Sequence, residues 1–246
     1  LSLIFLETII KRKIMYNLGL ICVRGNSKGV KDKNIKKFCG KPLIYWTINQ
    51  LKKVKRINRV IVSTDSKKIA LTAKKFGAEI LFMRPKKLAQ SNSPEWEVWR
   101  HAINFLKKKE KILPKIVLNM PVTSPCRNLK DINRGINFFF KNKFELVTAV
   151  RDSERNPYFN MVTRDKNSEI KIAIKPKKKI VNRQSAPRVY DMTTLFHIVE
   201  PKTILHKNNV FDCKVGSILV DKISSIDIDT EEDFKLAELF FKNLKK

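Results

Sequence analysis

Glycine, histidine and closely spaced cysteine are all scarce in this sequence, and each shortage excludes a class of protein. With 7 Gly and 10 Pro in 246 residues, there is little room for flexible linkers or low-complexity arms. The 4 cysteines (Cys22, Cys39, Cys126 and Cys213) show no CxxC spacing, and only 3 histidines are present. A zinc site is therefore not expected, and we expect a reduced, cytoplasmic protein.

Long apolar runs are also missing, so we expect no membrane insertion. The stretch Leu1–Ile10 is apolar, but Glu7 interrupts it and it is too short to span a bilayer. A basic cluster follows the apolar residues, whereas a secretory signal places its positive charge first. Because Met15 stands just before the first convincing strand, we interpret residues 1–14 as a non-native or disordered extension. Residues 15–246 then form a single domain.

Acidic residues are few: 23 Asp and Glu stand against 52 Lys and Arg, for a formal net charge of +29. A balance this basic suits polyanionic partners such as nucleic acid, anionic lipid or phosphorylated substrates. However, the lysines are spread along the whole chain and far outnumber the arginines, as the codon bias of an AT-rich genome produces. We favour codon bias and expect no nucleic-acid partner, since RNP and helix-turn-helix signatures are absent.

Short β-rich runs alternate with longer helical ones from Tyr16 onward. The expected strands are Leu18–Val23, Arg59–Ser63, Glu79–Met83, Ile116–Asn119 and Leu146–Val150. The expected helices are Pro42–Val54, Lys67–Phe76, Pro94–Lys108 and Leu129–Lys141. This alternation specifies an α/β fold, with a parallel sheet covered by helices on both faces.

The regular alternation ends after Val150. Residues 151–190 contain several Pro and Lys residues, and we interpret them as an excursion from the sheet that forms a lid or a dimer contact. Within it we expect a hairpin of Ile170–Ile174 with Lys179–Asn182. Beyond it we expect a strand at Thr194–Val199, a short helix near Pro201, a strand at Ser217–Val220 and a helix at Glu231–Leu244.

Polar segments stand at four expected strand ends: Arg24–Asn34, Ser63–Asp65, Pro121–Arg127 and Asp227–Asp229. Ligands of open parallel sheets bind at the carboxyl ends of the strands, so we expect these segments to converge. The first reads RGNSKGVKDKN, in which two glycines let the backbone approach a ligand and Arg24, Lys28, Lys31 and Lys33 add positive charge. It matches neither GxxxxGK[ST] nor GxGxxG, so a phosphate site and a solvated basic turn both remain open.

RGNSKGVKDKN resembles the RGxSKGxxxKN signature of the acylneuraminate cytidylyltransferases, or CMP-sialic acid synthetases. Further similar motifs follow in the same order: GKPLI at 40–44, STD at 63–65, RPKKLA at 84–89, TSPCR at 123–127, RQSAP at 183–187 and SIDIDTEEDF at 225–234. The resemblance covers nearly everything from Tyr16 onward. It implies a Rossmann-like, mostly parallel sheet with a protruding dimerisation element, and hence a homodimer.

The resemblance also implies an activity. The enzyme would transfer CMP from CTP to the anomeric hydroxyl of an acidic nine-carbon α-keto sugar, release pyrophosphate, and serve surface glycan biosynthesis. Arg24 and Lys33 match catalytic positions that hold the triphosphate and offset charge on the leaving pyrophosphate. Gly25 and Ser27 would add hydrogen bonds to the nucleotide. Asn34 and Arg84 match positions near the cytosine.

Asp227 and Asp229 match the positions that carry Mg²⁺ in this family. Two carboxylates at i and i+2 on a strand share one face, which suits a hard cation that bridges phosphate oxygens. The following residues Thr230–Asp233 also fit a capping box, in which Asp229 would only help to start the last helix. We favour the metal, with Asp229 also catalytic; either aspartate, or a hydroxide on the metal, could deprotonate the nucleophile.

The sugar-binding part of the motif set departs from the family. Arg183 matches a position that contacts the sugar carboxylate, and Gln184 and Thr193 are assigned to the same subsite. Pro121-Val122 replaces the usual Gln-Pro, and TTLFH at 193–197 replaces NGAIY. The stretch VYDMTT at 189–194 is closer to the bacterial branch that acts on legionaminic-type nonulosonates.

Three alternatives remain open at this point. One is a related nucleotidyltransferase that acts on the eight-carbon acid Kdo. A second is a nucleic-acid-binding protein, which the charge of +29 motivates. The third is a catalytically inactive, sugar-sensing relative, against which Arg24, Lys33, Asp227 and Asp229 argue because all four are intact.

Overall fold

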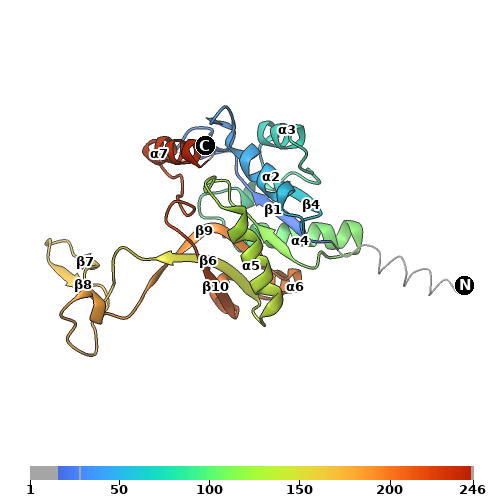
Figure 1. Cartoon of the computed structure of the whole chain (residues 1–246). Coiled ribbons are helices and arrows are strands. Elements are labelled where there is room, and N and C mark those ends of the chain that lie inside the picture. The colour runs from blue at the N-terminus through green and yellow to red at the C-terminus, as the bar shows by residue number, and fades with distance from the viewer. Residues whose placement is uncertain (1–15, 28, 245–246) are drawn as a thin grey trace, which may run out of the picture.

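A six-stranded sheet forms the centre of the computed structural model, which describes residues 16–27 and 29–244 (Figure 1). Its strands are β1 (Leu18–Cys22), β4 (Arg59–Ser63), β5 (Val117–Asn119), β6 (Leu146–Asp152), β9 (Tyr190–Val199) and β10 (Val215–Leu219). They lie in the order β10-β6-β9-β5-β1-β4. All neighbours are parallel except β9, which runs antiparallel to both β5 and β6. The predicted mostly parallel sheet is confirmed. The interpretation of residues 1–14 lies outside the described residues.

Helices cover both faces of this sheet because its strands are apolar on both sides. Leu18 and Leu20 of β1 pack in one apolar cluster. Ile21 lies on the opposite face of the strand and packs in another cluster. The first cluster contains α4 (Glu95–Glu110) and α6 (Pro201–His206). The second contains α2 (Leu43–Lys53), α3 (Lys67–Lys75), α5 (Leu129–Lys141) and α7 (Glu231–Asn243). Near-continuous apolar strands of this kind are typical of sheets that are buried on both faces.

The predicted strand Glu79–Met83 does not form. Only Glu79 touches the sheet, through a parallel bridge to Ile61 in which the backbone nitrogen of Glu79 donates to the Val60 oxygen at 2.7 Å. The chain then turns inward, and the backbone nitrogen of Arg84 donates to the Thr64 oxygen at 2.8 Å. The tertiary contacts of Arg84 with the ends of β1 and β4 therefore accompany a departure from the local β propensity of the segment.

Residues 153–189 leave the sheet as an arm, which we define by these residues (Figure 1). Strands β6 and β9 stay paired to its base, where Arg151 faces Asp191 and Asp152 faces Tyr190. Within the arm, β7 (Val162–Arg164) pairs with β8 (Ile170–Ile172). The expected partner Lys179–Asn182 is therefore wrong. The Asp165 carboxylate accepts hydrogen bonds from the backbone nitrogens of Asn167 and Glu169 and so closes a tight turn. Because of this turn, Ile170 pairs with Arg164, which is closer to it in sequence than the expected partner is.

Several short elements complete the fold. The strands β2 (Lys37–Phe38) and β3 (Lys41–Pro42) form a small hairpin whose turn contains Gly40, with φ of 82°. Single turns of 3₁₀ helix span Lys33–Ile35, Lys86–Leu88, Arg183–Ser185 and Val210–Asp212. Among the described residues, no helix is long and apolar enough to cross a membrane.

Candidate functional site

The loops that follow β1 and β5 meet at the carboxyl edge of the sheet and enclose a cavity of about 270 Å³, here named the loop pocket. Its lining residues are Cys22, Val23, Arg24, Ser27, Gly29, Lys33, Asn34, Pro121, Val122, Thr123 and Asp229. The C-terminal segment joins the loop after β5, since the Ile228 nitrogen donates to the Thr123 oxygen at 2.9 Å. Three of the four predicted polar segments therefore line one pocket, and the fourth lies beside it.

Two cations in the loop pocket differ in how they are held. Lys33 is largely buried; its Nζ donates to the Ile228 oxygen at 2.5 Å and lies 3.7 Å from Asp229 Oδ1. Within the described part of the chain, the Arg24 guanidinium has no hydrogen bond or ion pair. The buried Asn34 amide instead donates to the Arg24 backbone oxygen at 3.0 Å, which fixes the start of the loop. Arg24 is thus positioned by its backbone and keeps its charged end available for an anion.

The two glycines of this loop contact protein rather than empty space. The backbone nitrogen of Gly25 donates to Asp65 Oδ1 at 2.8 Å, so this amide is not available for a phosphate. A methyl carbon placed on Gly29 would lie 1.9 Å from the backbone oxygen of Asp229. Gly29 therefore allows two backbone segments to touch. Ser27 lines the pocket, and Lys28 lies outside the described residues.

The segment Asp227–Asp229 is irregular, so the prediction that both carboxylates share one strand face is wrong. Strand β10 ends at Leu219, and the Asp221 carboxylate then accepts from the Ser224 backbone nitrogen at 2.7 Å, which turns the chain. Asp229 nevertheless lines the loop pocket with a side chain that is 78% exposed. The Oδ1 atom of Asp227 is buried without a hydrogen-bond partner among the described residues.

The capping box at the start of α7 is also present. Thr230 Oγ1 accepts from the Asp233 nitrogen, and Asp233 Oδ2 accepts from the backbone nitrogens of Asp229 and Thr230. These hydrogen bonds lower the pKa of the Asp233 carboxyl. Because Thr230 and Asp233 cap the helix, the carboxylate of Asp229 is not needed for capping. The described residues contain no group of three or more His, Cys, Asp or Glu side chains that could hold a metal ion.

A second cavity of about 220 Å³ adjoins the first and shares Cys22 and Arg24 with it. We name it the helix pocket because α4 begins at its edge. Its lining residues are Cys22, Arg24, Arg84, Leu88, Gln90, Ser91, Ser93, Glu95 and Val98. Burial raises the pKa of the Cys22 thiol to about 12, so this cysteine stays protonated near neutral pH and is unsuited to nucleophilic chemistry.

Arg84 holds the wall of the helix pocket together. Its Nη2 donates to the backbone oxygens of Val23 and Ser63, at 2.7 and 2.5 Å, and its Nε donates to Ser63 Oγ at 3.2 Å. Burial lowers the pKa of this guanidinium. The side chain thereby ties the ends of β1 and β4 to each other, and most of its donors are already used.

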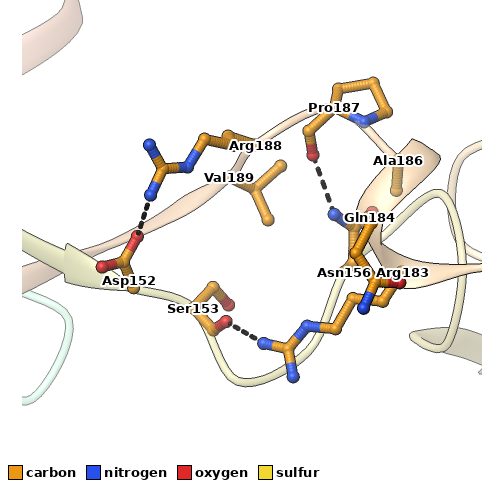
Figure 2. Close-up of a pocket in the computed structure, with 9 residues that line it drawn as sticks. All are labelled: Asp152, Ser153, Asn156, Arg183, Gln184, Ala186, Pro187, Arg188 and Val189. Atoms are coloured by element: carbon orange, nitrogen blue, oxygen red, sulfur yellow. Dashed lines mark hydrogen bonds and ion pairs between the residues drawn. The ribbon is translucent and has the colours of Figure 1, made fainter.

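The residues expected to bind a sugar lie elsewhere. Arg183 and Gln184 line a cavity of about 510 Å³ on the arm, where Arg183 Nη2 donates to the Ser153 oxygen at 2.8 Å (Figure 2). Thr193 is buried in β9 and its Oγ1 donates to the Ala149 oxygen at 2.9 Å, so it reaches none of these three cavities. In a single copy of the chain, the structure therefore separates these three residues from the loop pocket.

The sequence analysis assigned no individual role to two residues of this region, Asp65 and Glu95. Asp65 belongs to the segment Ser63–Asp65, which was expected to converge with the first loop. This expectation could have indicated Asp65 as a partner for Gly25. Glu95 carries no such signal, because a glutamate at the start of a helix is common on protein surfaces. Only the fold shows that it faces a pocket.

Comparison with known proteins places this geometry in a family. The sequence profile described as Cytidylyltransferase matches residues 18–245. The CMP-N,N'-diacetyllegionaminic acid synthase of Campylobacter jejuni is 35% identical over 230 residues, which cover 92% of this chain and 96% of that protein. The Post-translational flagellin modification protein B of Campylobacter coli is 33% identical, over 92% of this chain and 94% of that protein. The N-acylneuraminate cytidylyltransferase of Escherichia coli is 29% identical over 89% of this chain but 51% of its own length.

Solved structures agree on the fold. A CMP:2-keto-3-deoxy-manno-octonic acid synthetase complexed with CTP superposes with a TM-score of 0.69 at 12% identity, over 93% of this chain and 99% of that one. The 4-diphosphocytidyl-2C-methyl-D-erythritol synthase of Anaerococcus prevotii superposes with a TM-score of 0.61 at 17% identity, over 94% and 96%. At these identities the likeness supports the α/β architecture alone.

Proposed function

The chain belongs to the cytidylyltransferase family, and from that premise we propose that it transfers CMP from CTP to a sialic-acid-like nonulosonate, with release of pyrophosphate. The name of one relative, the CMP-N,N'-diacetyllegionaminic acid synthase of Campylobacter jejuni, favours an acid of the legionaminic type. The observation that carries the proposal is the Arg24 guanidinium, which has no hydrogen bond or ion pair among the described residues and lies with Ser27, Lys33 and Asn34 in one pocket at the carboxyl edge of the sheet. A cation held there without a counterion suits a polyphosphate.

The triphosphate would lie along the loop pocket. Arg24 would contact phosphate oxygens directly, since no described residue bonds to its guanidinium. Lys33 is anchored at the Ile228 oxygen and would add charge to the same site. Transfer of this kind requires little covalent help from the protein, so positioning and charge are what such residues supply.

In the proposed reaction the anomeric hydroxyl oxygen of the sugar attacks the α-phosphorus of CTP. A new phosphorus–oxygen bond forms, and the bond between the α-phosphorus and its bridging oxygen breaks. Pyrophosphate leaves with that electron pair, and the hydroxyl proton passes to a base. Arg24 and Lys33 would offset the charge that develops on the departing oxygen.

Magnesium is the proposed cofactor, with Asp227 and Asp229 as its protein ligands. The Oδ1 of Asp227 is buried without a hydrogen-bond partner among the described residues, and the carboxylate of Asp229 is exposed with Lys33 Nζ at 3.7 Å from its Oδ1. Both groups are hard oxygen donors. Two carboxylates are few for a calcium site, but they suit Mg²⁺, which is usually bound by one or two carboxylates together with substrate phosphates. When bound, the ion supplies positive charge that offsets the phosphate oxygens.

The arm is the proposed sugar and dimer element. Arg183 and Gln184 would bind the sugar carboxylate and its neighbouring hydroxyls, for which a guanidinium is a natural bidentate partner. Both side chains lie outside the loop pocket, so they can serve the reaction only when an arm approaches that pocket. The arm also exposes large apolar side chains, which favours a homodimer: Phe159, Met161, Val162, Ile170, Ile174 and Val181. We place the reaction in the cytoplasm, where CTP is available.

A pyrophosphate-release assay tests the proposed function. CTP and Mg²⁺ would be combined with N-acetylneuraminic, N,N'-diacetyllegionaminic, pseudaminic and Kdo acids in separate reactions. We expect release that depends on both the acid and CTP, and that is fastest with a legionaminic-type acid. Release with Kdo alone would assign the chain to the eight-carbon branch instead, and absence of release with every acid would refute the proposal.

A further inference from the structure

The helix pocket contains a carboxylate that the proposed chemistry does not use. Glu95 is the first residue of α4, and its Oε1 accepts from Asn119 Nδ2 at 3.1 Å and from Trp99 Nε1 at 3.3 Å. No donor in the described residues reaches its Oε2. The side chain faces the pocket, so water reaches it from that side, while protein surrounds the carboxyl elsewhere. The carboxyl group is thus anchored by one oxygen and open at the other.

The surroundings of Glu95 make a structural role an insufficient explanation. Burial raises the pKa of its carboxyl, against the opposing effects of Asn119, Trp99 and Arg84. A carboxylate placed only to favour the start of a helix needs no contact with the sheet, whereas Glu95 accepts a hydrogen bond from Asn119 of β5. A carboxyl group that is held through one oxygen, with the other oxygen uncommitted at a pocket wall, is the arrangement expected of a ligand contact.

Two other polar side chains of the helix pocket, those of Arg84 and Ser93, are already engaged. The Arg84 guanidinium is occupied by the ends of β1 and β4. Ser93 Oγ donates to the Lys87 oxygen and accepts from the Gln90 nitrogen, both at 3.1 Å. Of the described residues that line the helix pocket, Glu95 is the acidic one, and its Oε2 is available to a ligand that donates a hydrogen bond.

The position of the helix pocket identifies the part of the nucleotide that would enter it. If the phosphates lie at Arg24 in the loop pocket, the base must occupy space within one ribose of them. The helix pocket meets this condition, because Cys22 and Arg24 line both cavities. Cytosine presents a 4-amino donor where uracil presents an oxygen acceptor, and carboxylates are known partners of that amino group.

We propose that Glu95 is the residue that selects cytosine over uracil, with its Oε2 accepting a hydrogen bond from the 4-amino group of CTP. The proposal rests on the proposed function, because it takes the nucleotide to be a cytidine triphosphate. In UTP the 4-oxygen would face the Glu95 oxygen, so two acceptors would meet without a proton between them. A site whose buried polar group is left unpaired by the wrong ligand discriminates strongly.

The substitution Glu95→Gln tests this assignment sharply. Asn119 and Trp99 both donate to the Oε1 position, so they should hold the amide oxygen of the glutamine there. Its amino group would then face the base and donate to the 4-oxygen of uracil. We expect the ratio of kcat/KM for CTP to that for UTP to fall by about 10- to 100-fold. Glu97→Gln is the matched control, because Glu97 lies on the same helix, pairs with Arg100 and lines neither pocket.

A second measurement uses the unaltered protein, so the test does not depend on how a variant folds. The pyrimidin-2-one analogue of CTP lacks the 4-amino group, and its dissociation constant from the wild type should exceed that of CTP by about 10- to 100-fold. Equal affinity for CTP and the analogue, or an unchanged CTP-to-UTP ratio in folded Glu95→Gln, would overturn the role of Glu95. Failure of the proposed function gives a different result: the wild type would release no pyrophosphate with any acid, whatever the base.

Discussion

Replacement of Gly29 by alanine should disable nucleotide use without unfolding the protein. The added methyl carbon would lie 1.9 Å from the Asp229 backbone oxygen, whereas real contacts of this kind are essentially never under 3.0 Å. The backbone of Gly29 does not lie in the left-handed region, so alanine suits its local conformation and the contact with Asp229 is the whole perturbation. The two segments must therefore separate by about 1 Å, since neither neighbour is a flexible side-chain end.

This separation would widen the loop pocket between the loop that contains Gly29 and the segment that contains Asp229. Lys33 Nζ lies 3.7 Å from Asp229 Oδ1 and donates to the Ile228 oxygen, so a shift of the Asp229 backbone changes the positions of these groups together. A displacement of about 1 Å at a reacting centre can cost about 100-fold in rate. We expect kcat/KM for CTP to fall by about that factor in Gly29→Ala, measured by pyrophosphate release.

Gly40→Ala is the matched control. Gly40 has φ of 82° and no atom within 4 Å of an added methyl carbon, so its substitution strains the backbone of the β2–β3 turn and touches no pocket. It should lower the free energy of unfolding by about 1 kcal/mol and leave the CTP kinetics of the folded protein unchanged. If kcat/KM for CTP in Gly29→Ala stays within about threefold of the wild type, the inferred contact between the two segments is wrong.

Three further predictions follow from particular contacts. Arg24→Met keeps the aliphatic stem and should raise the CTP dissociation constant by about 10-fold or more, whereas Lys31→Met, an exposed residue of the same loop, should change it little; equal effects in calorimetry would contradict a specific role for Arg24. Asp229→Asn should raise the Mg²⁺ concentration for half-maximal activity by about 10-fold or more, and an unchanged midpoint in a metal titration would exclude Asp229 as a ligand. Burial lowers the pKa of His197 from 6.5 to about 4, so its neutral form favours folding above pH 6.5 and this stability is lost as the pH falls toward 4. The free energy of unfolding, measured with urea, should fall between pH 7 and pH 5 by about 2 kcal/mol less in His197→Phe than in the wild type. The same dependence of this free energy on pH in both proteins would refute the prediction.

Much of the architecture was predictable because the signals that specify it are local. Alternation of apolar runs with helical periodicity predicted the parallel strands and the helices on both faces, and most element bounds agree within two residues. The place of β9 was not predictable, because its antiparallel pairing joins Val199 to both Val117 and Leu146. Pairings between residues so far apart in the chain leave no periodic pattern in either segment.

The convergence of the predicted polar segments was predictable in part, whereas the roles of their residues stay predictions. The loop Arg24–Asn34 and the segment after β5 were identified, and both line the loop pocket. The shared strand face of Asp227 and Asp229 was wrong, since the turn closed by Asp221 ends the strand early. Thr193 was assigned to the sugar, but it is a buried residue that bonds to Ala149.

The sequence by itself determined the kinds of group available: four cations and two glycines in one loop, two aspartates near the last helix, and the motif set of a cytidylyltransferase. Only the tertiary structure decided which atoms remain free for a ligand. The Gly25 amide is taken by Asp65 and the Lys33 ammonium by an oxygen 195 positions away, while no residue that the structure describes bonds to the Arg24 guanidinium or to the second oxygen of Glu95. The physical reason is that a polar atom bonds to whatever the fold brings within about 3 Å, and chain order does not record that distance.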